Sequence, residues 1–420
     1  MSENSIATRK MKDSGVEWIG EIPEDWDIKR LKAVLCERNE SNNPIKTDYI
    51  LSLTNDRGVI PYDEKGDVGN KSKEDVSGYK LAYPNDIVLN SMNVIIGSVA
   101  LSKYYGCVSP VYYMLYPRNP MDDVRYYNYI FQTKEFQSKL KGYGNGIMEI
   151  RMRIQMSKLN TVELPIPDAT TQTRIADFLD EKCGKIDRYI EKQQQVIEKL
   201  NSYKMSLITE NAISNYMTIP LRHLIKSIEQ GWSPPAADKV DESIGWSVLS
   251  LSAVKQGKFH GDAKKLIDIS SDIPHILELH NNDFLMTRSN TRELVGDVCI
   301  VEDCSPHMIF SDLIYRITFK DGVSIEYMRY ALLSSYVRQQ IQEMARGSSG
   351  TMPKISHKSI KELRVPLLEK EEQGTIVQRL NKVCSRIDKI ICQKETIIKK
   401  LTEYKKSLIY EAVTGKKVVE

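Results

Sequence analysis

Two short loops have the composition of a phosphate-binding segment. Residues 142–146 (Gly-Tyr-Gly-Asn-Gly) and 347–351 (Gly-Ser-Ser-Gly-Thr) lie within windows 137–160 and 338–361, each with five basic residues and one glutamate. Small residues let backbone N–H groups approach a phosphate, while Arg and Lys neutralise its charge. The pattern predicts nucleic-acid contacts from these side chains: Lys141, Asn145, Arg151, Arg153, Arg346, Ser348, Ser349, Thr351 and Lys354.

Two further segments carry side chains that can read bases. Each half of the chain has an Asn-Asp pair followed by an apolar stretch and then by polar residues. These polar residues are Asn90, Ser91 and Asn93 in the first half, and Arg288, Asn290 and Arg292 in the second. Asn and Arg side chains can form paired hydrogen bonds with the edges of adenine and guanine. A charged window is usually only a solvated surface, but its recurrence at an equivalent position favours nucleic acid.

Residues suited to catalysis are hard to find. All six histidines lie in the second half, and neither His275 and His280 nor Cys299 and Cys304 have the spacing of a zinc site. No glycine-rich nucleotide fingerprint occurs. The segment 233–236 (Ser-Pro-Pro-Ala) has Ala236 where an amino-methyltransferase has the aromatic residue that stacks on a flipped base. We therefore expect no catalytic residue, no metal site and no cofactor in this chain.

The elements that position these segments occur twice. Aligning residues 172–210 with 373–411, an offset of 201, gives 16 identical residues in 39 positions. Chance would give roughly two to four at ordinary composition. Upstream the offset drifts, which indicates loops of unequal length on a shared framework. The chain therefore consists of a module and a helix, repeated once.

Both repeated segments predict long helices with a heptad seam, because apolar residues alternate at steps of four and three. The span 175–210 would be roughly 54 Å long at 1.5 Å per residue. We expect the helices to pair as an antiparallel coiled coil; packing of each helix on its own module, or pairing between molecules, stays open. Polar Gln193 and Lys394 lie at mid-seam. The other seam residues are Leu179, Cys183, Ile186, Ile190, Ile197, Leu200, Leu207, Leu380, Cys384, Ile387, Ile391, Ile398, Leu401 and Leu408.

The segments between the helices predict mixed α and β structure. By β-branched and aromatic content and flanking turns, the expected strands are 49–54, 86–90, 108–115, 246–252, 283–287 and 313–319. The expected helices are 124–141 and 325–345. The fold class is α+β: an N-terminal segment (1–25), module 1 (26–170), a long helix (171–213), module 2 (214–370) and a second long helix (371–415).

The composition of the chain excludes several classes of protein. The chain has 420 residues, 41% hydrophobic and 27% charged, which excludes a disordered or collagen-like chain. Its net charge of +3 argues neither for nor against nucleic acid. No apolar run approaches the roughly 18 residues of a membrane span. The start lacks a signal-peptide core, and seven scattered cysteines indicate reduced thiols, so we expect a cytoplasmic protein.

Four elements give the chain a family resemblance. They are the opening 11–26, beginning Met-Lys-Asp-Ser-Gly-Val-Glu-Trp, and the junction 164–167 (Leu-Pro-Ile-Pro) leading to Gln172, Ile175 and Leu179. The junction recurs as Val365-Pro366 leading to Gln373 and Ile376, with Leu368 at the second proline's place. The fourth is Gly231-Trp232-Ser233-Pro234, which module 1 lacks. Together they resemble the specificity subunit of Type I restriction–modification systems.

The resemblance implies a division of labour. Each module would be a target recognition domain that reads one half of a bipartite site in double-stranded DNA. The paired helices would set the separation of the half-sites and dock two methyltransferase subunits, which bring S-adenosylmethionine. Restriction subunits, where present, would add ATP- and Mg-dependent cleavage. A coiled-coil scaffold without DNA contact and a DNA-processing enzyme with a cryptic site are the alternatives.

Overall fold

The computed structural model describes residues 9–55, 57–66, 75–143, 153–213, 217–233, 245–267, 275–345, 352–366 and 368–419. The chain forms two compact units. Unit 1 comprises residues 1–193 and 396–420, and unit 2 comprises residues 194–395. Each unit therefore contains one module and a part of both long helices. None of the helices in the described ranges is long and apolar enough to cross a membrane.

The two longest helices are α5 (Ala169–Ile213) and α9 (Lys370–Val413), and both cover the predicted heptad segments. The shorter helices of module 1 are α1 (Leu31–Val34), α2 (Val124–Gln132), α3 (Lys134–Lys141) and α4 (Met156–Leu159). Those of module 2 are α6 (Ile325–Leu333), α7 (Ser335–Met344) and α8 (His357–Glu362).

Unit 1 has a four-stranded antiparallel sheet in the order β4-β11-β8-β9. Its strands are β4 (Leu35–Arg38), β11 (Tyr112–Pro117), β8 (Ile87–Asn90) and β9 (Val99–Leu101). The remaining strands form two-stranded ladders: β1 (Met11–Asp13) with β2 (Glu21–Pro23), β3 (Asp27–Arg30) with β12 (Glu163–Ile166), β5 (Leu51–Thr54) with β6 (Gly58–Pro61), and β7 (Lys80–Ala82) with β10 (Gly106–Val108).

Unit 2 repeats this sheet in the order β14-β22-β19-β20. Its strands are β14 (Ile225–Gln230), β22 (Ile314–Phe319), β19 (Phe284–Thr287) and β20 (Val298–Ile300). A second sheet has the order β18 (Lys264–Leu266), β15 (Ser247–Leu249) and β21 (Met308–Phe310). The other pairs are β13 (Thr218–Pro220) with β23 (Arg364–Pro366), and β16 (Val254–Lys255) with β17 (Lys258–Phe259). The prediction of two mixed α and β modules is thus confirmed.

Four predicted elements differ from the structure for local reasons. The strand predicted over 246–252 ends as β15 at Leu249, and residues 251–253 form a 3-10 turn in which the Ala253 amide donates to the Ser250 carbonyl. The helices predicted over 124–141 and 325–345 are each broken in two, because Thr133 and Ser334 turn extended and cap a new helix. Their hydroxyls accept hydrogen bonds from the amides of Phe136 and Val337, as N-caps do. The strand predicted over 108–115 is interrupted by a turn in which the Tyr112 amide donates to the Ser109 carbonyl.

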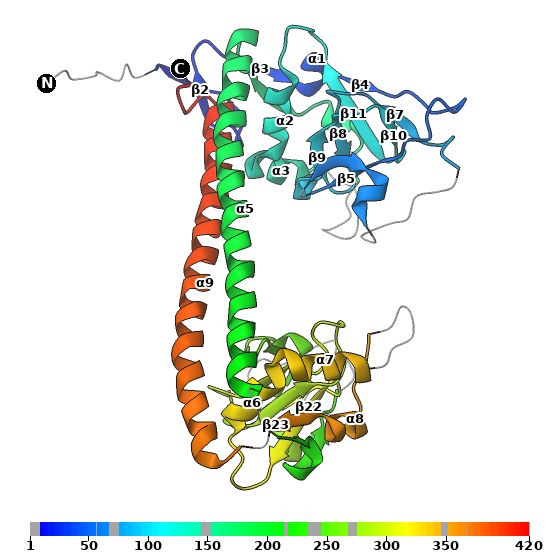
Figure 1. Ribbon diagram of the computed structural model, residues 1–420. Helices are drawn as coiled ribbons and strands as arrows, with labels where there is room; N and C mark the ends of the chain where they lie inside the picture. Colours follow the sequence, from blue (N-terminus) through cyan, green and yellow to red (C-terminus); the bar gives the residue numbers. More distant parts are fainter. Residues whose placement is uncertain are drawn as a thin grey trace, which may run out of the picture. The chain divides into compact units, whose positions relative to one another are not determined.

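Within each unit, segments of α5 and α9 lie side by side with opposite chain directions (Figure 1). In unit 1, Leu179 and Cys183 share a core with Leu408, and the ammonium group of Lys405 pairs with Asp187 at 2.7 Å. In unit 2, Ile208 shares a core with Leu380 and Cys384, and Lys204 pairs with Asp388 at 2.8 Å. Every seam position of the predicted heptads is buried or half-buried.

A buried glutamine ties each module to its long helix. Gln172 and Gln373 are 1% and 6% exposed. Their amide nitrogens donate to the carbonyls of Pro167 and Leu368, at 3.1 and 3.0 Å. Their amide oxygens accept from the backbone N–H groups that precede α2 and α6. This explains physically why the glutamine occurs at both junctions: no apolar residue could satisfy these buried backbone groups.

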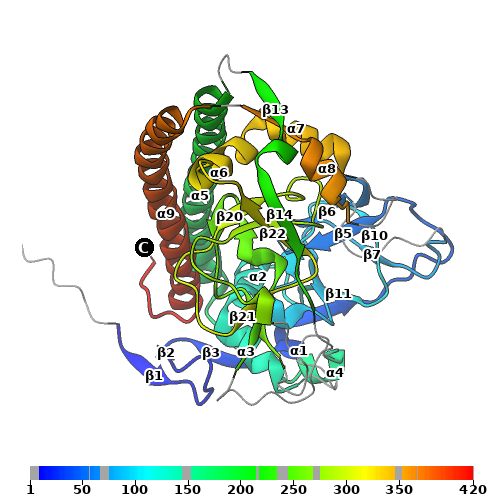
Figure 2. The same ribbon diagram turned by 90° about the horizontal axis from the view of Figure 1, so that it is seen from below.

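A buried tyrosine completes the same attachment. The hydroxyl of Tyr126, on α2, lies 2.8 Å from the Pro165 carbonyl and 2.9 Å from the Val413 carbonyl. The hydroxyl of Tyr327, on α6, donates to the Ala212 carbonyl at 3.0 Å. Figure 2 shows this attachment in unit 2, where α6 lies against the end of α5. Both modules are therefore fastened to the helices by the same kinds of contact.

Candidate nucleic-acid interface

In module 1 the structure joins two segments that are distant in sequence. One is the reading loop that follows β8, residues 90–93. The other is the basic segment 153–154. The amide of Ile154 donates to the Ser91 carbonyl at 2.9 Å, and the hydroxyl of Tyr113 donates to the Ile154 carbonyl at 3.2 Å. The loop predicted to read bases and the segment predicted to bind phosphate therefore lie side by side in module 1.

Module 2 makes the same junction between its reading loop, residues 288–292, and its basic segment, residues 352–355. The amide of Ile355 donates to the Arg288 carbonyl at 2.9 Å, and Ser289 forms a β-bridge with Lys354. The hydroxyl of Tyr315 donates to the Ile355 carbonyl at 3.4 Å. Ser91 and Arg288 thus occupy equivalent positions, although they differ in size and charge.

The prediction for Ser91 is corrected by its burial. Its side chain is 0% exposed, and its hydroxyl donates to the Val111 carbonyl at 2.7 Å. A hydroxyl that is buried and already bonded is not available to a base. Ser91 therefore holds the loop against β11, which leaves Asn90 and Asn93 as the predicted base-reading residues of the module 1 loop.

The remaining predicted side chains of module 1 differ in burial and in the hydrogen bonds that they already form. The side-chain oxygen of Asn90 accepts from the Met92 amide at 3.0 Å, which leaves its NH₂ group to donate. Asn93 is half-buried, and its side chain does not cap the turn that it begins. Arg153 is exposed beside Ile154, and Lys141 is the exposed last residue of α3.

In module 2 the arginines of the reading loop are held differently. A guanidinium nitrogen of Arg288 donates to the Asp312 carbonyl at 3.3 Å, whereas Arg292 and Lys354 are exposed. The side-chain oxygen of Asn290 accepts from the Thr291 amide at 2.9 Å. Arg288 is therefore oriented before any ligand arrives, which reduces the entropy lost when it binds.

Two neighbours of Arg288 were not predicted as site residues. The hydroxyl of Ser233 donates to a carboxylate oxygen of Asp312 at 2.6 Å. His357 begins α8, and its ring contacts that of Tyr315 at a tilt of 59°, with the centroids 4.5 Å apart. Burial lowers the pKa of His357, and the charges of Lys361 and Arg288 lower it further. Its imidazole is thus neutral at pH 7 and can accept or donate a hydrogen bond without adding charge.

The Gly-Trp-Ser element of the family resemblance lies beside the same loop. The Trp232 amide donates to the Phe310 carbonyl at 2.9 Å. A Cβ atom at Gly231 would overlap the backbone oxygens of Phe310 and Ser311, so only glycine fits. This close approach brings Ser233 to Asp312, and it gives the glycine of that element a physical role.

Some predicted residues lie outside the described part of the chain. They are Asn145, Arg151, Arg346, Ser348, Ser349, Thr351 and Ala236. Of the described residues, no three His, Cys, Asp or Glu side chains converge as a metal site requires. His275 and His307 instead contact the Trp246 ring, with centroids 5.1 and 4.9 Å apart.

Comparison with known families identifies the architecture. The family model described as "Type I restriction modification DNA specificity domain" matches residues 23–201 and 277–402, well over half of the chain. The chain belongs to this family. The resemblance drawn from the sequence elements is confirmed, and the chain recognises DNA sequence in a restriction–modification system. The scaffold and the cryptic enzyme are not favoured.

Two relatives in this specificity family match along most of their length. The Type I restriction enzyme MjaVIII specificity subunit of Methanocaldococcus jannaschii is 22% identical over 418 residues, covering 94% of this chain and 93% of the relative. The EcoKI specificity subunit of Escherichia coli K12 is 21% identical over 422 residues, covering 94% and 90%. Proteins of this family are generally non-catalytic.

A solved structure shares the fold of this chain. It comes from a study of complex assembly and conformational transition of the type I R-M system. It aligns with a TM-score of 0.65 and 12% identity, covering 93% of this chain and 98% of that chain. The likeness supports the fold described above, with two mixed α and β modules and two long helices.

Proposed function

We propose that the chain reads a bipartite DNA target, with one half-site for each module. The observation that carries this proposal is the junction of reading loop and basic segment in both modules, made by the same backbone hydrogen bond. The framework repeats, but the side chains that it presents differ, so the two half-sites should differ in sequence. Phosphate contacts would position each module, and base contacts would specify the sequence.

We also propose that α5 and α9 pair along their length as an antiparallel coiled coil. Support comes from the low exposure of every heptad seam residue and from the ion pairs Lys204–Asp388 and Lys405–Asp187. Such a pair would act as a spacer between half-sites. The polar seam residues Gln193 and Lys394 would select this register over others.

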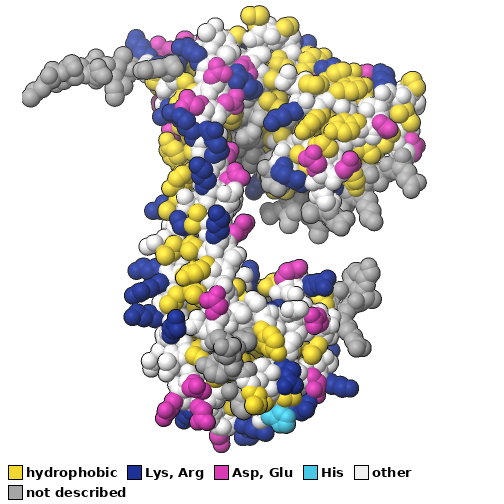
Figure 3. Space-filling model, in the orientation of Figure 1, with side chains coloured by type: hydrophobic (Ala, Val, Ile, Leu, Met, Phe, Trp, Pro, Cys, Tyr) yellow, Lys and Arg dark blue, Asp and Glu magenta, His cyan; other side chains and the backbone are white. Residues whose placement is uncertain are grey.

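Two copies of a methyltransferase subunit are the proposed partners of the helices. Outside the seam, each helix exposes apolar side chains at intervals of seven residues: Tyr189, Val196 and Tyr203 on α5, and Ile390, Ile397 and Tyr404 on α9. Figure 3 shows apolar side chains on the helix surface between clusters of Lys and Arg. Two equivalent sets suit two copies of one partner, since repeated surfaces bind repeated subunits.

The chemistry of modification and cleavage is assigned to the partners. The methyltransferase subunits would supply S-adenosylmethionine, and restriction subunits would supply ATP- and Mg-dependent cleavage. The chain alone should therefore show no turnover when incubated with plasmid DNA and either S-adenosylmethionine or Mg²⁺. Robust methylation or cleavage by the lone chain would contradict this assignment.

Methylome sequencing tests the reading function directly. Cells that carry this chain and its methyltransferase partner should methylate one motif with two specified halves and an unread spacer. A continuous motif, or no motif that depends on this chain, would contradict bipartite reading.

The partner sites can be tested separately from the reading function. Tyr203→Glu should place a charge in one exposed apolar set and lower the number of bound methyltransferase subunits from two to one. Tyr404→Glu should do the same on α9. Lys226→Glu, on β14, is the control. Native mass spectrometry measures the stoichiometry, and two bound subunits in both variants would refute these sites.

A further inference from the structure

A cleft of about 570 Å³ opens in unit 2, where α5 and α9 meet the helices α6 and α7. Its other walls are the turn Gln256–Lys258 and parts of the segment 293–297. Small-molecule sites commonly measure about 300–1,000 Å³. The reading loop 288–292 and the basic segment 352–355 do not line it, so the cleft is distinct from the candidate DNA interface.

One part of the cleft is apolar. Ile208 and Leu333 are 1% and 8% exposed, and Met205 and Leu294 are half-buried. These side chains come from α5, α6 and the loop before β20, and they line one continuous cavity. A ligand that enters the cleft can therefore bury an apolar body, which is favourable by roughly 25 cal/mol for each Å² removed from water.

Two arginines line the same cleft without an anionic partner. Arg338 donates from one guanidinium nitrogen to the Glu293 carbonyl at 2.8 Å, and its other terminal nitrogen is buried without a partner. Arg329 makes hydrogen bonds of 3.4 Å to the Gly257 carbonyl and the Asn381 side chain, and its guanidinium lies 4.9 Å from the centroid of the Tyr330 ring. Its Nε is also buried without a hydrogen-bond partner. Neither arginine forms an ion pair within the described ranges.

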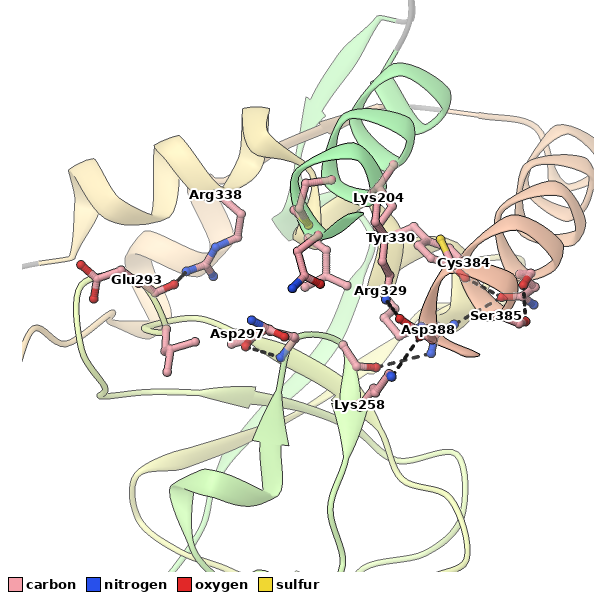
Figure 4. Close-up of a pocket in the computed structure, with 18 residues that line it drawn as sticks. Lys204, Lys258, Glu293, Asp297, Arg329, Tyr330, Arg338, Cys384, Ser385 and Asp388 are labelled. Atoms are coloured by element: carbon pink, nitrogen blue, oxygen red, sulfur yellow. Dashed lines mark hydrogen bonds and ion pairs between the residues drawn. The ribbon is translucent and has the colours of Figure 1, made fainter. Parts of the chain in front are cut away.

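Two of the three carboxylates that line the cleft are already engaged, and the third, that of Glu293, is exposed to solvent. Asp388 accepts Lys204 at 2.8 Å and Lys258 at 3.0 Å. Asp297 is 4% exposed and accepts the backbone amides of Gln256 and Val298. Figure 4 shows Arg338 and Asp388 on opposite sides of the cleft. Because a buried polar group without a hydrogen-bond partner is unfavourable, the unpartnered nitrogens of the two guanidinium groups favour an added anion.

The pKa values reflect this imbalance. Burial lowers the pKa of the Arg338 guanidinium, and the carboxylate of Asp297 offsets only a part of that effect. Burial also raises the pKa of Asp297, against the hydrogen bonds that it accepts. An anion bound beside Arg338 would favour the charged form of the guanidinium.

The shared framework does not need these cations. At the equivalent positions, 201 residues earlier, module 1 has Asn128 and Gln137. Gln137 fills its place on α3 by donating to the Phe131 carbonyl at 3.0 Å. The helix pair α2 and α3 thus folds with neutral side chains. The shared framework therefore does not account for the arginines of α6 and α7.

We propose that this cleft binds a small organic anion with an apolar body. Its acidic group lies beside Arg329 and Arg338, and its body lies against Met205, Ile208, Leu294 and Leu333. Guanidinium groups suit this task because they are weakly hydrated and can offer two parallel donors to a carboxylate, sulfonate or phosphate. The site does not depend on DNA recognition, because its lining contains none of the candidate base-reading residues.

Calorimetric titration of the full-length chain tests the proposal with three probes. Naphthalene-2-sulfonate carries both the charge and the apolar body, naphthalene-2-sulfonamide lacks the charge, and inorganic phosphate lacks the body. We expect the sulfonate to bind at one site and the other two probes to bind at least about tenfold more weakly. No saturable binding of the sulfonate, or equal binding of the sulfonamide, would overturn the proposal.

Matched variants locate the site. Arg329→Asn with Arg338→Gln introduces the residues of module 1 and should weaken the sulfonate at least about tenfold. Arg222→Gln removes a cation that pairs with Glu362 outside the cleft and should bind like the unaltered chain. Unchanged binding by the double variant would overturn the site.

A measurement on the unaltered chain guards against misfolding of the double variant. Hydrogen exchange at the turn Gln256–Lys258 should slow when naphthalene-2-sulfonate is added. Unchanged exchange at that turn would equally overturn the proposal.

Discussion

Modules 1 and 2 have the same buried framework and present different surfaces. In both, a tyrosine on the central strand fixes the basic segment, and a glutamine at the helix junction satisfies buried backbone groups. At equivalent positions of the reading loops, however, Ser91 is buried and Arg288 reaches the surface. The comparison shows that backbone contacts give the two reading loops the same geometry. The side chains of the loops can therefore differ between the modules, and with them the DNA sequence that each module would read.

The two modules also place a partly buried ion pair on different strands. Asp86 and Asp283 precede the equivalent strands β8 and β19. Asp86 is paired with Arg38 of the outer strand β4 at 2.8 Å. Asp283 is paired with Arg316 of the inner strand β22 at 3.2 Å, and Arg316 also pairs with Glu229 of β14 at 2.6 Å. The carboxylate is part of the framework, whereas the strand that supplies the guanidinium has changed.

The largest expected effect comes from exchanging one module. Replacing residues 217–369 with the matching segment of a relative should change one half of the methylated motif completely and leave the other half as it was. Each module carries its own reading loop and basic segment, which is the physical reason. Methylome sequencing measures the methylated motif, and a change in both halves would contradict independent reading by the two modules.

Disrupting the ion pair of module 2 should affect stability next most strongly. Arg316→Met leaves Asp283, Glu229 and two backbone carbonyls without their donor. We expect a loss of about 2–4 kcal/mol in the stability of unit 2, somewhat less than for a fully buried pair. Hydrogen exchange of the β19 and β22 amides measures this loss.

A pair of substitutions in module 1 tests whether the guanidinium group can be moved from one strand to the other. Arg38 and Met114 face one another across β4 and β11, as Glu229 and Arg316 do in module 2. Arg38→Glu or Met114→Arg alone should destabilise unit 1, and the two together should recover a part of the loss. Additive losses would show that the two strands are not interchangeable.

Specificity should respond to Arg288 and not to its equivalent Ser91. Arg288→Ala should relax one base position of one half-site by roughly 1–3 kcal/mol. Ser91→Ala removes a hydroxyl that bonds to the Val111 carbonyl, so it should lower stability and leave base preference unchanged. Competition binding with single-base variants of the target measures the base preference of both variants. A changed base preference in Ser91→Ala would contradict the buried role.

The smallest effects should be alike in the two modules. Arg153→Ala and Lys354→Ala remove exposed cations at positions 201 residues apart. Each should weaken binding to all sequences equally and reduce the salt slope by about one. Anisotropy titrations at several salt concentrations measure the slope. A sequence-dependent loss in either variant would show that the residue contacts a base.

The sequence by itself determined the features that depend on local pattern. The heptads predict the course of α5 and α9, and the offset of 201 predicts two modules on one framework. Strands such as β8, β19 and β22 follow from apolar and β-branched stretches bounded by turns. The sequence pattern predicts one continuous helix over 124–141, but the structure has a break at Thr133. Threonine is a favoured N-cap residue, so a new helix start at this position is compatible with the sequence.

Only the tertiary structure decided which predicted site residues can meet a ligand. The burial of Ser91 depends on the Val111 carbonyl, 20 residues away, and the orientation of Arg288 depends on the Asp312 carbonyl, 24 residues away. The joining of reading loop and basic segment spans more than 60 residues in each module. Such contacts form when a sheet closes, and a periodicity of two, three or four residues contains no information about them.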